Sequence, residues 1–328
     1  MIDLPASPRR PARAAFLVKL IVSSLLLGIL FWRVDRAAFL RSLQTLPLSL
    51  LLGCGALYVL GYLISIVRWQ RLLRAEGIHL DLWRLGLVYF EGAFFNLFLP
   101  TVIGGDIVRG YLIYKMTSGH DASIASILVD RLAGFAALML IAVTALTLAY
   151  GTLNDPQVAL AILTIVACFT GVMLVLLNRW LTTRVSAVLS VIGLARFQAK
   201  LHGLVDALQR YRRHRRALAQ AFLLSALLQA LIIVTYYFIG VGLHLGVPLL
   251  YFFLFVPLIT ALSMLPVSVA GLGVREGGVI YFFGKVGVDA ATALGMSLVW
   301  FSLTLLVSSL GGLAFLVDAH IAKRAGDA

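Results

Sequence analysis

Long apolar runs separated by short charged loops dominate the hydrophobic pattern of the chain. Six runs approach or exceed the roughly 20 residues that a helix needs to cross about 30 Å of hydrocarbon. The alternating pattern typical of membrane strands is absent from them. We therefore expect an all-α polytopic integral membrane protein with about six full transmembrane helices. The expected crossings are residues 15–32, 48–67, 123–150, 158–177, 217–240 and 291–317.

Two further apolar regions, residues 85–103 and 251–283, are interrupted by proline, glycine and charged residues. Each contains a similar motif, LPTVIGGDIVR at Leu99–Arg109 and LPVSVAGLGVR at Leu265–Arg275. The second motif begins 166 positions after the first. Irregular backbone is tolerated at membrane depth only where protein or a water-filled cavity covers it. We interpret both regions as broken re-entrant hairpins, each of which enters and leaves the membrane on one side.

The offset of 166 residues also relates longer elements, because it places the second expected crossing over the fifth and the third over the sixth. Three crossings separate the two hairpins, so the halves point in opposite directions, as in the inverted repeats of transporters. We therefore expect one transmembrane domain built from an inverted internal repeat. Its expected parts are a cytoplasmic tail at 1–14, a domain at 15–317 with repeats at about 15–150 and 158–317, and a cytoplasmic tail at 318–328.

The distribution of charge predicts the orientation. The chain has 27 Lys and Arg against 14 Asp and Glu, a formal net charge of +13. Basic residues concentrate in the two tails and in residues 179–216, whereas the loops at 151–157 and 241–248 contain neither Lys nor Arg. Because basic loops stay on the cytoplasmic side, we expect a multi-pass protein of the inner (plasma) membrane with both termini in the cytoplasm.

The segment 179–216 combines this charge with apolar residues at helical spacing, which is typical of an amphipathic helix on a membrane surface. Its bases lie in short loops beside apolar runs, a pattern that favours attraction to anionic lipid over binding of nucleic acid. The residues expected to contact the anionic inner leaflet are Arg210, Arg212, Arg213, Arg215 and Arg216.

Charged residues in or beside the broken regions are the candidates for chemistry. A charge at membrane depth costs at least about 2.5–3.5 kcal/mol and usually serves a substrate or ion path. Asp106 and Arg109, three positions apart, could instead pair with each other. Arginine side chains and helix ends both suit phosphate. The candidate binding residues are Glu91, Asn96, Asp106, Arg109, Asp130, Arg131, Arg275 and Glu276, and the candidate hinge residues are Pro100, Gly104, Gly105, Pro266, Gly271 and Gly273.

Catalytic and cofactor motifs are not recognisable in the sequence. The six histidines lack metal-ligand spacing, and there is no phosphate-binding Walker A loop. We therefore expect no metal, no cofactor and no enzymatic activity, although Glu91 or Asp130 could serve as a general base. Trp69, Trp83 and Trp180 lie near expected membrane borders, and we interpret them as interfacial anchors.

Four groups of residues resemble motifs of the lysylphosphatidylglycerol synthase transmembrane (flippase-like) family, over about residues 15–320. The resemblance implies a module that moves an aminoacylated lipid outward. It further implies that a stand-alone member, without the soluble aminoacyl-transferase domain, handles other amphiphiles such as isoprenoid or hopanoid-type lipids. The groups are Arg68-Trp69 with Arg71-Leu72-Leu73, Phe95–Thr101 with Gly104-Gly105-Asp106 and Arg109, Asp130-Arg131 with Gly134, and Pro266 with Gly271-Leu272-Gly273 and Arg275-Glu276.

We therefore expect a stand-alone flippase that moves a phospholipid or isoprenoid-type lipid through a polar cavity between the two hairpins. In this interpretation Arg109 and Arg275 hold a phosphate, while Glu91, Asp106 and Glu276 receive a cationic head group or carry a proton. The alternatives are a membrane enzyme that modifies a lipid head group and a transport subunit for a separate transferase. Lipids are the expected partners, with a homo-oligomer as a further candidate and no nucleic acid.

Overall fold

All regular structure in the described part of this computed structural model is helical. The structure describes residues 44–98, 104–117, 122–149, 155–191, 196–264, 268 and 271–326, with scattered positions between 21 and 39. The expected all-α class is confirmed. The helices are α3 Leu48–Ala75, α4 Leu82–Phe98, α5 Gly104–Met116, α6 Ala122–Leu148, α7 Pro156–Leu177, α8 Arg179–Val191, α9 Arg196–Tyr211, α10 Arg215–Gly242, α11 Leu249–Ser263, α12 Val274–Gly284 and α13 Ala290–Gly326.

Among the described residues, five helices are long and apolar enough to span a membrane: α3, α6, α7, α10 and α13. They match five of the six expected crossings, so the protein is a polytopic membrane protein. The remaining crossing, residues 15–32, lies outside the described residues apart from scattered positions. Two helices extend beyond their expected ends. Arg68, Trp69 and Leu72 are buried, so α3 continues to Ala75, and α13 continues through most of the expected C-terminal tail.

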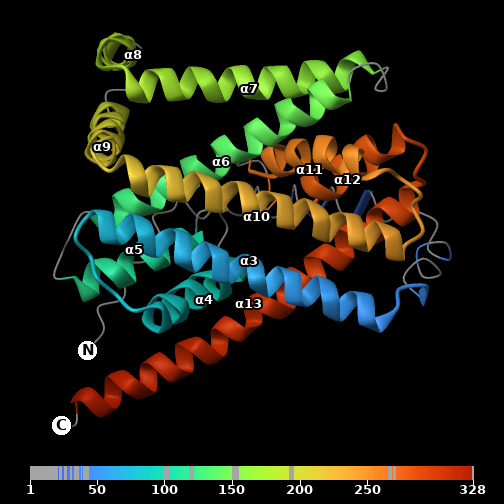
Figure 1. The fold of residues 1–328 in the computed structure, drawn as a ribbon, viewed down its shortest axis with the longest axis horizontal. Coiled ribbons are helices and arrows are strands. Elements are labelled where there is room, and N and C mark those ends of the chain that lie inside the picture. The colour runs from blue at the N-terminus through green and yellow to red at the C-terminus, as the bar shows by residue number, and fades with distance from the viewer. Residues whose placement is uncertain are drawn as a thin grey trace.

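The long helices run roughly parallel to one axis of the molecule (Figure 1). α3 and α10 pack side by side in opposite directions, and α6 and α13 also run in opposite senses. The two pairs α4–α5 and α11–α12 each form a helical hairpin. α4 packs on α13 and α11 packs on α6, so each hairpin contacts the last long helix of the other half. The two halves therefore share an order of elements and a pattern of contacts.

The hairpin helices are short. The longest, α4, has 17 residues, which at 1.5 Å per residue falls short of about 30 Å of hydrocarbon. The open ends of the two hairpins lie at opposite ends of the long helices (Figure 1). Residues 99–103 and Pro266 lie outside the described residues, so the expected hinges Pro100 and Pro266 have no structural account.

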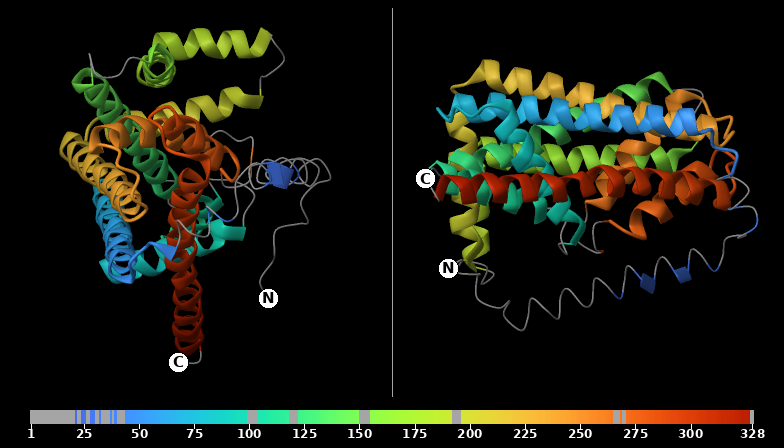
Figure 2. Two further views of the ribbon diagram at one scale, coloured as in Figure 1. Left: turned by 90° about the vertical axis from the view of Figure 1, so that its right-hand side faces the viewer. Right: turned by 90° about the horizontal axis from the view of Figure 1, so that it is seen from below.

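The expected amphipathic segment 179–216 consists of two helices and the start of a third. α8 and α9 lie across the ends of the long helices, on the side where the chain ends (Figures 1 and 2). α9 buries Val205, Leu208 and Tyr211 in a cluster with residues of α3 and α6, so this apolar face packs on protein instead of lying on the leaflet. The five expected lipid-contacting arginines, positions 210, 212, 213, 215 and 216, are all exposed.

An ion pair joins α7 to the end of α12 on the opposite side of the molecule. Asp155 caps α7 by accepting a hydrogen bond from the backbone N–H of Gln157 at 2.9 Å. The ammonium of Lys285 donates to the other carboxylate oxygen of Asp155 at 2.5 Å. This hydrogen bond lowers the pKa of the Asp155 carboxyl below its ordinary value. The pair is partly accessible to solvent.

The contact between α4 and α13 depends on Gly311. A Cβ at this position would lie 1.9 Å from the carbonyl oxygen of Phe90, which is much shorter than the sum of the two van der Waals radii. We expect Gly311→Ala to force the helices apart and to destabilise the protein by about 1–3 kcal/mol, as overpacking does. Thermal unfolding of the purified protein in detergent measures the change. Gly53→Ala in α3, where a Cβ meets nothing within 4 Å, is the matched control. Equal melting temperatures for the two variants would contradict the close approach.

Candidate functional site

A cluster of five charged side chains lies between α3, α5 and α6. Arg68 comes from α3, Asp106 and Arg109 from α5, and Asp130 and Arg131 from α6. The first four are nearly inaccessible, with relative exposures of 2–6%. The Arg131 side chain, at 43% exposed, reaches out of the cluster. The structure thus brings four of the eight candidate binding residues together and adds Arg68.

The best-formed pair in the cluster is Arg68 with Asp130. Arg68 donates from Nε and Nη2 to the two oxygens of Asp130, at 2.6 and 3.0 Å. Its Nη1 donates to the hydroxyl of Ser225 at 2.8 Å. Two parallel charge-assisted hydrogen bonds fix both side chains. Because Ser225 belongs to α10, this one guanidinium connects α3, α6 and α10.

Asp106 is shared by two arginines. Its Oδ1 accepts from Nη1 of Arg109 at 3.1 Å, and its Oδ2 accepts from Nε of Arg131 at 2.6 Å. The local pairing of Asp106 with Arg109, considered from their spacing, is therefore confirmed. Asp106 also lies in the first turn of α5, where the helix dipole favours negative charge.

Arg109 is held chiefly by aromatic rings. Its guanidinium carbon lies 4.1 Å from the ring centres of both Trp69 and Tyr89, within cation–π range. Its Nη2 is 3.9 Å from an oxygen of Asp130, which is too long for a hydrogen bond. Among the described residues, neither Nε nor Nη2 of Arg109 has an acceptor. Two donors of a buried arginine therefore remain available.

The two donors of Arg109 without an acceptor are the open feature of the cluster. The cluster holds three arginines and two aspartates, and a further carboxylate, that of Glu91, is buried on the adjacent helix α4. Buried donors in a membrane domain are costly unless they are paired. A bound anion would supply acceptors for Arg109, so the arrangement suits a phosphate or carboxylate.

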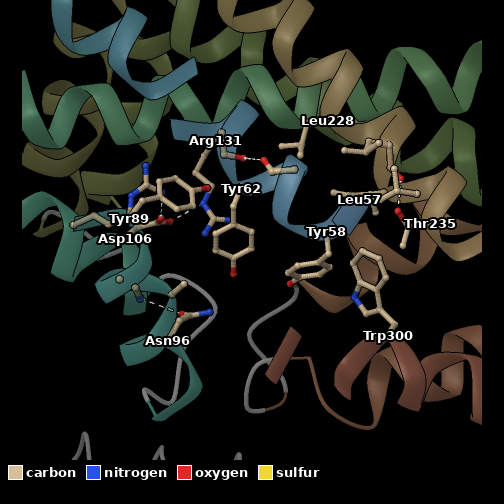
Figure 3. Close-up of a pocket in the computed structure, with 18 residues that line it drawn as sticks. Leu57, Tyr58, Tyr62, Tyr89, Asn96, Asp106, Arg131, Leu228, Thr235 and Trp300 are labelled. Atoms are coloured by element: carbon tan, nitrogen blue, oxygen red, sulfur yellow. Dashed lines mark hydrogen bonds and ion pairs between the residues drawn. The ribbon is translucent and has the colours of Figure 1, made fainter. Parts of the chain in front are cut away.

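A cavity of about 320 Å³ opens beside the cluster. Its volume is at the lower end of the range for small-molecule sites. Asp106, Arg109 and Arg131 are its charged lining residues. Thr235 and Trp300 lie on the side opposite Asp106 (Figure 3). The cavity is therefore bounded by both halves of the chain, and its charged lining residues all belong to the first half.

Tyrosines of α3 line the middle of this cavity and tie it to α13. The hydroxyl of Tyr58 donates to Thr304 at 3.1 Å, and that of Tyr62 is 3.1 Å from the hydroxyl of Ser308. Tyr58 also packs edge-on against Trp300, with ring centres 5.2 Å apart. These hydrogen bonds connect α3 to α13 along the wall of the cavity.

Asn96 and two glycines shape the wall formed by the first hairpin. The side-chain oxygen of Asn96 accepts from the backbone N–H of Gly105 at 3.1 Å, so this N–H of the first turn is occupied. A Cβ on Gly105 would lie 2.3 Å from the carbonyl oxygen of Gly92, which explains why α4 and α5 cross at glycines. α5 begins at Gly104, so the expected hinge residues Gly104 and Gly105 lie in its first turn.

The other candidate residues lie away from the cavity. Glu91 on α4 is buried at 2% exposure but does not line it. Arg275 donates to Glu276 from Nη2 at 2.5 Å and from Nε at 2.9 Å. Glu276 also accepts from the backbone N–H of Gly273 at 2.6 Å and is fully buried.

The second motif therefore forms a closed ion pair at the start of α12. Gly271 and Gly273 adopt positive φ angles of 76° and 83° in the preceding turn, which other residues rarely adopt. No residue of α11 or α12 lines the cavity. Among the described residues, this cavity is therefore lined by the first hairpin and not by the helices of the second, and Arg275 is paired with the adjacent Glu276.

Sequence reasoning missed Arg68 and the aromatic residues around Arg109. Arg68 follows an apolar run and therefore resembled a membrane border, although its occurrence in a family motif was a signal. Trp69 was expected at the interface but is fully buried, whereas Trp83 and Trp180 are 68% and 62% exposed. In the part of the chain that the structure describes, no three His, Cys, Asp or Glu residues are grouped as a metal site.

Comparison with known proteins agrees with this architecture. The model of the family described as Lysylphosphatidylglycerol synthase TM region matches residues 16–312. No curated protein and no solved structure matches the chain significantly. The matched range contains the buried cluster, both hairpins and the cavity. The chain therefore belongs to the Lysylphosphatidylglycerol synthase TM region family.

Proposed function

We propose that the protein is a lipid translocator that binds an anionic head group in the cavity beside the buried cluster. The observation that carries this proposal is the pair of unused donors on Arg109, a buried arginine that lines the cavity. Phosphate is the anion that arginine recognises best, through several hydrogen bonds at once. The chain belongs to a family of membrane domains named after a lipid synthase. This family supports a phosphate that is part of a lipid.

An apolar groove next to the cavity supports an amphiphilic substrate. The groove has a volume of about 650 Å³ and is lined mainly by apolar side chains of α5 and α6, including Ile107, Tyr111 and Ile127. Asp106 and Arg131 line both the groove and the cavity. A lipid with its phosphate near Arg109 would thus have an apolar surface for its chain within reach of the same site.

We further propose that the hairpins α4–α5 and α11–α12 are re-entrant from opposite faces of the inner membrane, with both termini in the cytoplasm. The exposed arginines between α9 and α10 support a cytoplasmic position for that end. In a cysteine-free background, a cysteine replacing Asp155 should react with an impermeant maleimide on intact cells, and one replacing Arg212 only after lysis. The reverse pattern would refute this orientation.

Modification of a head group is a weaker alternative on structural grounds. Both oxygens of Asp130 are engaged by Arg68, which makes Asp130 a poor general base. Glu91 does not line the cavity. Neither of the two bases considered from the sequence is therefore placed to act on a ligand in the cavity.

Reconstitution distinguishes transport from modification. Purified protein in vesicles with a fluorescent phospholipid should increase the exchange of label between leaflets, as measured by dithionite quenching. Mass spectrometry of the same vesicles should show unchanged lipid masses. A new lipid mass without faster exchange would instead support an enzyme, and neither change with any phospholipid would refute the proposal.

A further inference from the structure

A second polar groove lies at the end of the molecule that carries α8 and α9. It has a volume of about 620 Å³ and is separate from the buried cluster. It forms where the end of α3 meets the start of α8 and the turn between α9 and α10. Its polar lining residues are Glu76, Arg179, Asp206, Gln209, Arg210, Arg213 and His214.

Glu76 is the unusual residue of this groove. Its side chain is only 9% exposed, and its Oε1 has no hydrogen-bond donor among the described residues. Its Oε2 is 3.7 Å from Nε of Arg210, an ion-pair contact that is too long for a hydrogen bond. The neighbouring Tyr211 hydroxyl donates to the carbonyl of Leu72 at 3.1 Å and does not serve Glu76. A buried carboxylate oxygen without a donor is unfavourable, so the groove has a place for an N–H or O–H of a ligand.

The rim of the groove has the opposite charge. Arg179 uses Nε to donate to Gln209 at 3.0 Å, and the Arg210 side chain is half exposed. Arg213 is exposed, and its guanidinium forms no hydrogen bond or ion pair in the described part of the chain. With Asp206 included, three arginines face two carboxylates. A ligand that fits must therefore offer an anion to the rim and a hydrogen-bond donor, best a cationic one, to Glu76 in the interior.

The side chains beside the groove are of the kind found at the membrane interface. Trp180, next to Arg179, is 62% exposed, and the guanidinium of Arg184 lies 5.3 Å from its ring centre. An exposed tryptophan beside arginines is typical of the membrane interface. α8 carries this pair across the ends of the long helices (Figure 1). We propose that the groove binds the head group of a phospholipid with a primary ammonium, with the phosphate at Arg210 and Arg213 and the ammonium at Glu76.

This site is independent of transport, and lipid retention by the full chain tests it. The purified protein is equilibrated in detergent with equal amounts of phosphatidylethanolamine, phosphatidylcholine and phosphatidylglycerol, and native mass spectrometry counts the retained lipids. Phosphatidylcholine has the same net charge but an ammonium that cannot donate. We expect preferential retention of phosphatidylethanolamine, and a roughly tenfold loss of this preference in Glu76→Gln, which corresponds to one charge-assisted contact.

Two further variants keep the test informative if Glu76→Gln fails to fold. Arg213→Gln should weaken retention of phosphatidylethanolamine several-fold, whereas Arg212→Gln, with the same loss of charge but outside the groove, should not. Equal retention of the three lipids by the wild type, or equal effects of the two arginine variants, would overturn the site. Glycerophosphoethanolamine, which lacks the chains, should compete only weakly. Competition as strong as that of the lipid would overturn the assignment to a lipid.

Discussion

Asp130→Asn is expected to destabilise the protein by about 3–5 kcal/mol, the usual result of removing one partner of a buried ion pair. In the variant, Arg68 stays buried and charged. The amide of the new asparagine can accept only one of the two hydrogen bonds that Arg68 donates to Asp130. Because Arg68 also contacts Ser225, the loss affects the packing of α3, α6 and α10 together. Thermal unfolding in detergent, with size-exclusion chromatography of the folded fraction, measures the change.

Two comparisons give this experiment its specificity. The double variant Arg68→Gln with Asp130→Asn removes both charges and should recover part of the stability, since coupled partners are not additive. Asp155→Asn, which breaks the accessible pair with Lys285, should have a much smaller effect. If Asp130→Asn melts like Asp155→Asn, the buried pair does not stabilise the fold as described.

Arg109→Lys is expected to weaken binding of an anionic head group by at least about tenfold, or 1.4 kcal/mol, while the protein remains folded. Lysine keeps the positive charge near Asp106. It lacks the planar guanidinium that lies against Trp69 and Tyr89, and it cannot offer the two unpaired donors, Nε and Nη2, in a fixed geometry. Calorimetric titration with a short-chain phosphatidic acid measures the affinity. Arg71→Lys, on the exposed face of α3, is the control and should bind like the wild type.

An unchanged affinity in Arg109→Lys would show that charge alone is sufficient and that the geometry of the guanidinium is irrelevant. A loss of affinity in both lysine variants would place the ligand elsewhere on the molecule. Only a loss confined to Arg109→Lys agrees with the proposed site.

Hydropathy predicted the helices well because the membrane imposes length and composition on each span. The ends were less predictable. The crossing at 48–67 extends to Ala75 because Arg68 and Trp69 find buried partners that lie far away in the sequence. The pairing of Arg68 with Asp130, 62 positions apart, depends on how α3 packs against α6. No local pattern could predict it.

The two similar motifs show a different limit. Position 272, which corresponds to Asp106 in the repeat, is a leucine, and the residue after Arg275 is Glu276. Arg109 therefore shares Asp106, three residues before it, with Arg131 and keeps two free donors, whereas Arg275 is paired with the adjacent Glu276. The repeat predicted two equivalent halves of one site. Two corresponding positions, Asp106 against Leu272 and Gly110 against Glu276, thus distinguish the open site from the closed ion pair.

The central claim is that the cluster around Arg109 binds the head group during translocation. Its most direct test is the initial rate of phospholipid exchange between leaflets in vesicles that contain equal amounts of wild-type, Arg71→Lys or Arg109→Lys protein. The account predicts equal rates for the first two and a rate for Arg109→Lys close to that of protein-free vesicles. Exchange by Arg109→Lys at the wild-type rate would contradict it.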